Sequence, residues 1–497
     1  MKFPAIDLRQ TQHAASAAQL DALSSWIAVL PAEDNERGLR RMAYGAVLAQ
    51  RCARLPGGLK ANAPFITDLP NAIGSRLALA TVKRDIESFE LLTLARKLVA
   101  VHATLKSETV GVYVAGFRGK AAERIAEAVM AALLAAVAPM PDRRSKPEPP
   151  WSLKSIHLFG CAPGHRFRRS FAELVGSSLA RHLAALPPNE LTPTQYRQRL
   201  AVIAKEYGLA LEFYDLEVLG KKKAGAFLAV AQGSPVADAG IARLRYMPPR
   251  AGRQAPVALV GKGICFDTGG VNVKPAKSML GMQGDMQGSA VALGTLLALA
   301  RLKADFPAEA WLALAMNHLG PNAYKPTDVV TASNGTTIEV IHTDAEGRMV
   351  LSDTLALCSA TRPRMIIDYA TLTGACVQAL GKAYSGVFTN QPKWWMKLIE
   401  IGRASGERVW PFPMDKDYDK YLESSIADLK QCYEEGQADH ILAARFLSRF
   451  VDEKIPWVHL DLSSASSKGG LAHVPTDFNG FGVRFTLNLL LDAKLGR

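Results

Sequence analysis

A turn that carries three charged side chains between a short strand and a helix constrains this chain more than any other stretch. The turn is Ile341-His-Thr-Asp-Ala-Glu-Gly-Arg348. Residues 337–341 alternate β-branched and polar side chains as a strand does, and apolar residues recur at helical spacing after the turn. In α/β sheets such turns lie at the carboxyl ends of strands, where these folds bind ligands. The pattern therefore predicts an α/β fold with Asp344, Glu346 and Arg348 at its binding edge.

These three residues allow two interpretations, a site that binds ions and a solvated turn that caps a helix. Two carboxylates two positions apart can bind one cation or a pair of cations. An arginine keeps its proton and cannot act as a base, but it can hold an anion. In a capping role, Glu346 would favour the positive end of the helix dipole. The turn alone leaves both interpretations open.

A second charged cluster precedes this turn. It begins with the apolar run 257–260, which ends at a glycine and is typical of a buried strand. Lys262, Asp267 and Lys274 follow, and Asp285 lies near the start of a Gly- and Ala-rich helix. Each residue alone has an ordinary explanation, such as a lysine lying along apolar surface or an aspartate in a turn or cap.

Taken together, four carboxylates without a group of Cys or His predict an oxygen-rich site for two divalent cations. They are Asp267, Asp285, Asp344 and Glu346. A lysine can join such a site as a ligand only if the metal displaces its proton, which a desolvated position beside two cations makes possible. A second lysine would then remain charged.

Both clusters resemble the signature of the leucine aminopeptidase family, the two-metal cytosol aminopeptidases of peptidase family M17. The matching motifs are Gly261-Lys-Gly-Ile-Cys-Phe-Asp267 with Lys274, Asp285-Met-Gln-Gly-Ser, and Thr343-Asp-Ala-Glu-Gly-Arg348. Their spacings agree as well as their letters. The similarity extends from about Ser177 to the C-terminus, and the part up to about Gly164 carries no such signature.

The resemblance implies an aminopeptidase that hydrolyses the N-terminal bond of peptides with a free α-amine and prefers apolar N-terminal residues such as leucine. It implies two divalent metals per subunit, Zn or Mn first and Mg or Co as alternatives. One metal would be held by Lys262, Asp267, Asp285 and Glu346, and the other by Asp267, Asp344 and Glu346.

The resemblance also suggests roles for residues that hold no metal. Lys274 would stabilise the oxyanion, and Arg348 would hold a bicarbonate that serves as general base. Met282, Thr371 and Gly374 would shape the pocket for the first side chain, although plain core packing fits Met282 equally well. Similar proteins assemble as hexamers, so a homo-hexamer is expected.

This sequence departs from the family pattern at four places. Gln283, before Asp285, stands where Lys or Arg is common, which would alter the charge of the site without removing a ligand. His342 stands where Asn is usual, beside the predicted ligands, and would either hydrogen-bond as the amide does or add a ligand. The segment 431–440 departs from a glycine-rich segment that helps line the entrance, and Ser463-Ser-Ala replaces a glycine-containing run. These changes bear on the range of substrates more than on catalysis.

The length of 497 residues exceeds the usual size of one domain. We expect a smaller N-terminal α/β domain at 1–165 and a catalytic domain at 166–497, with a bridging helix at about 167–186. The N-terminal part predicts strands at 76–82, 111–114 and 155–159 and helices at 39–54, 90–101 and 121–137.

The catalytic part predicts a mixed, largely parallel sheet flanked by helices. Its expected strands are 210–214, 225–231, 241–246, 256–260, 310–316, 337–341 and 365–369, and its expected helices are 194–207, 285–302 and 348–361. Lys262, Asp344 and Thr371 would each follow a strand and gather along one edge of the sheet.

Composition limits partners and location. The net charge of +13 lies mostly in residues 1–190, which hold 25 Lys and Arg against 16 Asp and Glu. Nucleic acid is a possible partner but is not favoured, because no nucleic-acid motif is present. The sequence predicts no signal peptide and no membrane span, and scattered cysteines that read as reduced thiols, so a cytoplasmic enzyme is expected. A DNA-binding regulator and a scaffold without catalysis are the alternatives.

Overall fold

Residues 5–164, 167–249, 251–252 and 254–496 are described by the computed structural model of this chain. They fall into two units, one formed by residues 1–174 with 468–477 and the other by residues 175–467 with 478–497. Each unit has its own hydrophobic core. None of the helices in the described part of the chain is both long and apolar enough to cross a membrane.

The first unit is built on a six-stranded sheet in the order β1-β6-β5-β2-β4-β3, parallel except for the pairing of β3 with β4. The strands are β1 Asp7–Thr11, β2 Ser25–Pro31, β3 Pro64–Asp68, β4 Arg76–Val82, β5 Thr109–Val114 and β6 Ser155–Phe159. The helices are α1 Ala17–Asp21, α2 Asn35–Arg41, α3 Gly45–Ala53, α4 Ser88–Ala103 and α5 Lys120–Val137. Helix α6 (Arg168–Ala184) starts in this unit's range and ends in that of the second.

The helix predicted at 39–54 is wrong, because the chain forms two helices there. Tyr44 has a φ of 63°, in the left-handed region, which interrupts the right-handed helix between α2 and α3. The other predicted strands and helices of this unit are confirmed within a few residues.

The second unit contains an eight-stranded sheet in the order β15-β14-β17-β13-β9-β10-β8-β7 and a three-stranded sheet in the order β11-β12-β16. The large sheet is mixed: the central strands β17, β13, β9 and β10 are parallel, and β8 and β7 are antiparallel at one edge. The predicted mixed, largely parallel sheet is confirmed.

The strands of the large sheet are β7 Ala210–Asp215, β8 Gly240–Tyr246, β9 Val257–Asp267, β10 Ala308–Asn317, β13 Met365–Ala370, β14 Ser385–Thr389, β15 Val409–Pro411 and β17 Trp457–Asp461. The small sheet has β11 Val329–Thr331, β12 Thr337–Glu339 and β16 Leu429–Lys430. The helices are α7 Pro193–Tyr207, α8 Leu216–Lys221, α9 Gly225–Ala231, α10 Ala276–Met279, α11 Gln287–Leu302, α12 Glu346–Ala360, α13 Gly374–Leu380, α14 Trp395–Ser405, α15 Asp439–Ser448 and α16 Val483–Leu487.

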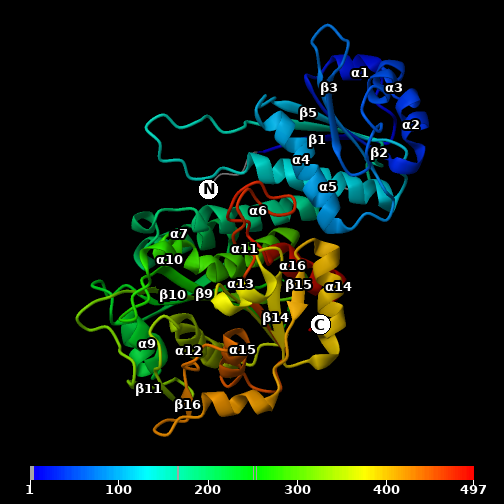
Figure 1. Cartoon of the computed structure of the whole chain (residues 1–497). Helices are drawn as coiled ribbons and strands as arrows, with labels where there is room; N and C mark the ends of the chain where they lie inside the picture. Colours follow the sequence, from blue (N-terminus) through cyan, green and yellow to red (C-terminus); the bar gives the residue numbers. More distant parts are fainter. Residues whose placement is uncertain (1–4, 165–166, 250, 253, 497) are drawn as a thin grey trace. The chain divides into compact units, whose positions relative to one another are not determined.

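Helices cover both faces of the large sheet, with α11 on one side of β9 and β10 and α9 and α12 on the other (Figure 1). The strand predicted at 225–231 is wrong, since this segment is helix α9. A short apolar run does not distinguish a strand from a buried helix. Here the amide of Phe227 donates to the Asp353 carboxylate at 2.8 Å, which satisfies a free N–H at the start of the helix.

Glycines allow α11 to lie directly on the sheet. A Cβ at Gly261 of β9 would lie 2.4 Å from Ser289 Cα, and a Cβ at Gly288 of α11 would lie 2.0 Å from the carbonyl oxygen of Tyr369. No side chain larger than hydrogen fits at either position without moving backbone. This close packing brings the start of α11 and the 3₁₀ turn Met282–Met286 against β9.

Candidate metal centre

Strand β9 supplies two of the charged residues, and it is longer than predicted. We expected the strand to end at 260 with Lys262 after it, but β9 continues to Asp267, so Lys262 lies inside the strand. Its side chain is 4% exposed. A Cβ at Gly347 would lie 2.7 Å from Lys262 Cε, so the glycine of the turn leaves room for the lysine stem.

The turn before α12 supplies two more carboxylates. Glu346 is the first residue of α12, where a negative charge is favoured by the helix dipole, and Asp344 lies in the turn just before it. The preceding strand, β12, belongs to the small sheet, so Asp344 does not follow a strand of the large sheet as predicted. Thr371 does follow the large-sheet strand β13 directly.

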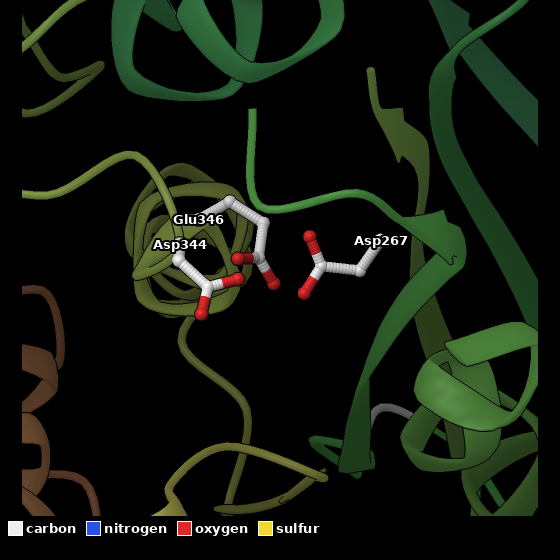
Figure 2. Close-up of side chains that lie close together, drawn as sticks. All are labelled: Asp267, Asp344 and Glu346. Atoms are coloured by element: carbon white, nitrogen blue, oxygen red, sulfur yellow. The ribbon is translucent and has the colours of Figure 1, made fainter. Parts of the chain in front are cut away.

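Three carboxylates converge at this place. Asp267, Asp344 and Glu346 each offer an oxygen within 4.8 Å of the others. Figure 2 shows Asp267 projecting from the end of β9 toward Asp344 and Glu346, which come from the turn and the start of α12. Asn317, at the end of β10, donates its side-chain amide to Asp267 Oδ1 at 2.8 Å and to the carbonyl of Thr343 at 3.0 Å. It thereby ties β9 to the turn.

Lys262 bridges this group to Asp285. Its Nζ lies 2.8 Å from carboxylate oxygens of both Asp285 and Glu346 and donates to the carbonyl of Thr371 at 2.9 Å. Burial opposes the charge of this ammonium, but the carboxylates of Asp285, Glu346 and Asp267 outweigh it and raise the pKa of Lys262. Lys262 is therefore a cation that partly neutralises these acids.

Lys274 occupies the other side of the cluster. Its Nζ lies 2.7 Å from Asp267 Oδ2 and also pairs with Asp344. Burial again opposes the charged form, and Asp267 and Glu346 overcome it, so that the pKa of Lys274 is raised. The side chain is 14% exposed, more than that of Lys262, so this ammonium can reach a bound molecule.

The donor set fits divalent cations. Burial raises the pKa of Asp285 to about 7 and those of Asp344 and Glu346 to about 6, against the opposing effect of the lysines. The cluster thus holds more carboxylate than its two lysines neutralise. Carboxylate oxygens at this density are ligands for Mg, Mn or Zn, and added positive charge relieves their repulsion.

Arg348 is the third residue of α12 and is 2% exposed. Its Nη1 donates to the carbonyl of Gln431 at 3.2 Å, and its Nη2 donates to Asp439 Oδ1 at 2.7 Å. Burial opposes the charge, and Asp439 more than compensates, so the pKa of Arg348 is raised. The predicted anion-holding arginine therefore already has a carboxylate of the same chain as its partner.

The three predicted pocket residues differ in their contacts. Thr371 donates its hydroxyl to Asp285 Oδ1 at 2.7 Å, so it positions a predicted ligand. Met282, the first residue of the 3₁₀ turn, is half-buried. Gly374, the first residue of α13, is exposed, and a Cβ there would meet no atom within 4 Å. His342 is exposed, and its Nδ1 accepts from the Asp344 amide at 3.2 Å.

Sequence reasoning missed three residues that organise the site. Asn317 joins Asp267 to the turn, as described above, and Asp439 pairs with Arg348. Gln431, fully buried, accepts at Oε1 from the amides of Ile341 and His342 at 3.1 Å and donates at Nε2 to the carbonyl of Ala345 at 3.0 Å. The only sequence signal for Gln431 and Asp439 was that their segment departs from the family pattern.

Comparisons with known proteins agree with the motifs. A profile of the cytosol aminopeptidase family, catalytic domain, matches residues 178–487. A probable cytosol aminopeptidase of Rhodopseudomonas palustris (strain BisA53) is 42% identical over 317 residues, which is 62% of this chain and 61% of the relative. Another from Wolbachia pipientis wMel is 43% identical over 318 residues, 63% of each chain. The chain therefore matches less than two thirds of the length of these curated relatives.

Solved structures match over nearly the whole chain. A mutant of tomato leucine aminopeptidase has a TM-score of 0.82 at 26% identity and covers 98% of this chain and 97% of its own. The bottromycin maturation enzyme BotP in complex with Mn has a TM-score of 0.79 at 28% identity and covers 95% of this chain and 100% of its own.

Proposed function

The chain belongs to the cytosol aminopeptidase family, and from this membership we propose that it is a metal-dependent aminopeptidase acting on peptides with a free α-amine. The observation that carries the proposal is the convergence of the Asp267, Asp344 and Glu346 carboxylates beside the buried Lys262 and the partly exposed Lys274. Burying so many carboxylates costs folding free energy unless positive charge compensates them, and divalent cations supply that charge.

We assign one cation to Lys262, Asp267, Asp285 and Glu346 and a second to Asp267, Asp344 and Glu346. When bound, divalent cations polarise the scissile carbonyl and make water acidic enough to attack it. Zn or Mn is the first choice, with Mg or Co as alternatives, and the Mn complex of BotP supports the place of Mn in this list. Lys262 must give up its proton to become a ligand.

The remaining residues bind and orient the substrate. Lys274 keeps its proton and stabilises the oxyanion that develops on the scissile carbonyl, because it stays cationic and partly exposed. The excess negative charge of the cluster favours a substrate that brings a free amine. Met282, Thr371 and Gly374 border the first side chain, and an apolar residue such as leucine is the proposed preference.

Bicarbonate, which the resemblance places on Arg348, does not fit the arginine as it stands. Its two Nη atoms already donate to the carbonyl of Gln431 and to the carboxylate of Asp439, so a carboxylate of the chain lies where the anion would bind, and only Nε has no acceptor among the described residues. We therefore assign no step to bicarbonate. A homo-hexamer and a cytoplasmic location are proposed from family membership alone.

The test is to remove metal with a chelator, restore Mn or Zn separately, and assay leucine anilide beside its N-acetylated form. We expect cleavage only after metal is restored and only of the free-amine substrate. Cleavage of the acetylated form at a similar rate would contradict the exopeptidase assignment. Absence of cleavage for a panel of free-amine substrates with every metal would contradict the enzyme assignment.

A further inference from the structure

The contacts of Arg348 point to a property beyond the proposed reaction. The guanidinium is buried, and its Nη2 donates to Asp439 Oδ1 at 2.7 Å across 91 residues of sequence. Its Nε makes no hydrogen bond with any residue that the structure describes. A buried guanidinium requires an anion, because a lone charge in the interior is costly. Asp439 supplies that anion from within the chain.

The local backbone fixes Asp439 in this position. Ala438 has a φ of 53°, in the left-handed region, which turns the chain immediately before α15. Asp439 is the first residue of that helix, where the dipole favours a negative charge. The same segment supplies Gln431, which is hydrogen-bonded both to Arg348 and to the turn that carries Asp344 and Glu346. The carboxylate is therefore built into the site.

The Asp439 carboxylate is also reachable from solvent. Its side chain is 27% exposed, against 2% for Arg348. Oδ1 is engaged by the arginine, while Oδ2 makes no hydrogen bond within the described residues. This is the arrangement of a small oxyanion seated on an arginine, with one oxygen held and the other free to accept a proton.

We propose that the Asp439 carboxylate, seated on Arg348, takes the place of dissolved bicarbonate as proton acceptor in this chain. The inference rests on the proposed aminopeptidase function. As water adds to the scissile carbonyl, the C–O bond forms and one water proton passes to Asp439 Oδ2. The same proton leaves with the departing amine as the C–N bond breaks, and Asp439 returns to the carboxylate. The enzyme is therefore independent of bicarbonate.

A purely structural role for Asp439, as partner of Arg348 and cap of α15, has to be distinguished from this. Asp419 provides a control, because its carboxylate accepts from Arg445 of α15 at 2.6 and 2.7 Å and also from Arg449 at 2.6 Å. Its side chain is 23% exposed and that of Arg445 is 10% exposed. Asp419→Asn therefore weakens a comparable Asp–Arg contact while Arg348 keeps Asp439 as its partner.

The first experiment measures hydrolysis of leucine anilide by the metal-loaded full chain in carbonate-free buffer and in buffer with bicarbonate. We expect the unsubstituted chain to change less than two-fold. Asp439→Gly should lose about 10²-fold without bicarbonate and recover at least ten-fold with it, since a general base contributes about that much. Asp439→Asn should lose activity, and bicarbonate should not restore it, because the asparagine amide still occupies the position beside Arg348 where bicarbonate would bind. Asp419→Asn should hydrolyse leucine anilide at the rate of the unsubstituted chain in both buffers.

The second experiment measures binding of ¹³C-labelled bicarbonate to the metal-free protein by NMR. We expect binding to Asp439→Gly and none to the unsubstituted chain, Asp439→Asn or Asp419→Asn. Circular dichroism checks folding, and if Asp439→Gly does not fold, loss of activity in folded Asp439→Asn carries the test. Stimulation of the unsubstituted chain by bicarbonate, bicarbonate binding to it, or full activity of Asp439→Asn without bicarbonate would overturn the proposal. An unsubstituted chain that cleaves nothing would contradict the proposed function instead. The binding experiment would still report whether Asp439 prevents bicarbonate from binding to Arg348.

Discussion

The two units bury different kinds of side chain. The sheet of the first unit is packed mainly by Val, Leu, Ile and Ala, and its buried polar groups include Ser25, Ser75 and His102. The second unit encloses Lys262 of β9 and Glu346 of α12, with further carboxylates at Asp267 and Asp285. Burying charge costs folding free energy unless each charge is paired. Among the described residues, the first unit buries the charged Glu173 but has no convergent acidic cluster, whereas the second unit has one at Asp267, Asp344 and Glu346. The difference indicates that the buried charges of the second unit serve its chemistry.

The largest effect should come from a carboxylate of the cluster. Asp267→Asn removes a charge shared by the two proposed cations, and we expect kcat/KM for leucine anilide to fall at least about 10³-fold. Asp142→Asn is the control in the first unit, since Asp142 pairs with Arg144 on the surface and such pairs contribute little. Equal activity of the two variants would remove the contrast between the units.

Metal binding should stabilise the second unit. At a free Mn concentration of 100 to 1,000 times Kd, a bound cation adds about 3 to 4 kcal/mol to the free energy of unfolding. Hydrogen exchange followed by mass spectrometry measures this peptide by peptide. We expect slower exchange in the peptides around 262–267 and 344–348. Protection that appears only in peptides of β2 and β5 would place the cation elsewhere.

Gly288→Ala tests whether close packing of α11 holds the site together. The new Cβ would lie 2.0 Å from a backbone oxygen of Tyr369, which cannot yield as a flexible side chain does, so we expect a loss of about 3 kcal/mol in stability and a loss of activity. Gly220→Ala is the matched control, because it lies in α8 with nothing within 4 Å of its Cβ. Urea denaturation should show no loss, or a gain of up to about 1 kcal/mol, for the control. Similar losses in both variants would disprove the packing argument.

In the first unit we expect a smaller effect on the free energy of unfolding, which depends on pH through His102. Burial, with a further contribution from Arg76, lowers the pKa of His102 to about 4 from about 6.5 in the unfolded chain. The folded state then binds fewer protons than the unfolded state between these values, so its stability falls as the pH falls from 6.5 to 4. We expect His102 to account for about 2 kcal/mol of that loss. Urea denaturation at pH 7 and pH 4.5 should show a smaller pH dependence for His102→Leu, and an unchanged difference would contradict this account.

The sequence predicted the α/β class and the main strands and helices between residues 76 and 369, because strands and helices alternate with clear periodicity there, but it carried no expectation for the strands and helices after β13. It was wrong at 225–231, where a short apolar run fits either structure, and at 39–54, where the break at Tyr44 depends on a backbone angle that composition does not reveal. It gave no expectation for β1, β2 or β3, of which β2 is fully buried and central. In β2, a buried run carries no period that separates a strand from a buried helix.

The predicted metal ligands lie in short, dense motifs, which is why a single sequence was sufficient to propose them. The groups that orient them act across long separations in sequence. Asn317 reaches Asp267 across 50 residues, and Gln431 reaches Ile341 across 90. An amide or an aspartate in a loop has no special composition, so only the folded chain shows that it contacts the site.

Anomalous diffraction from crystals soaked in Mn tests the central claim most directly, because it locates metal without reference to activity. The account predicts two peaks at the end of β9, one beside Lys262 and Asp285 and the other beside Asp344, with Asp267 and Glu346 contacting both. Two Mn peaks elsewhere, or none at these carboxylates in a crystal that holds Mn at other sites, would contradict it.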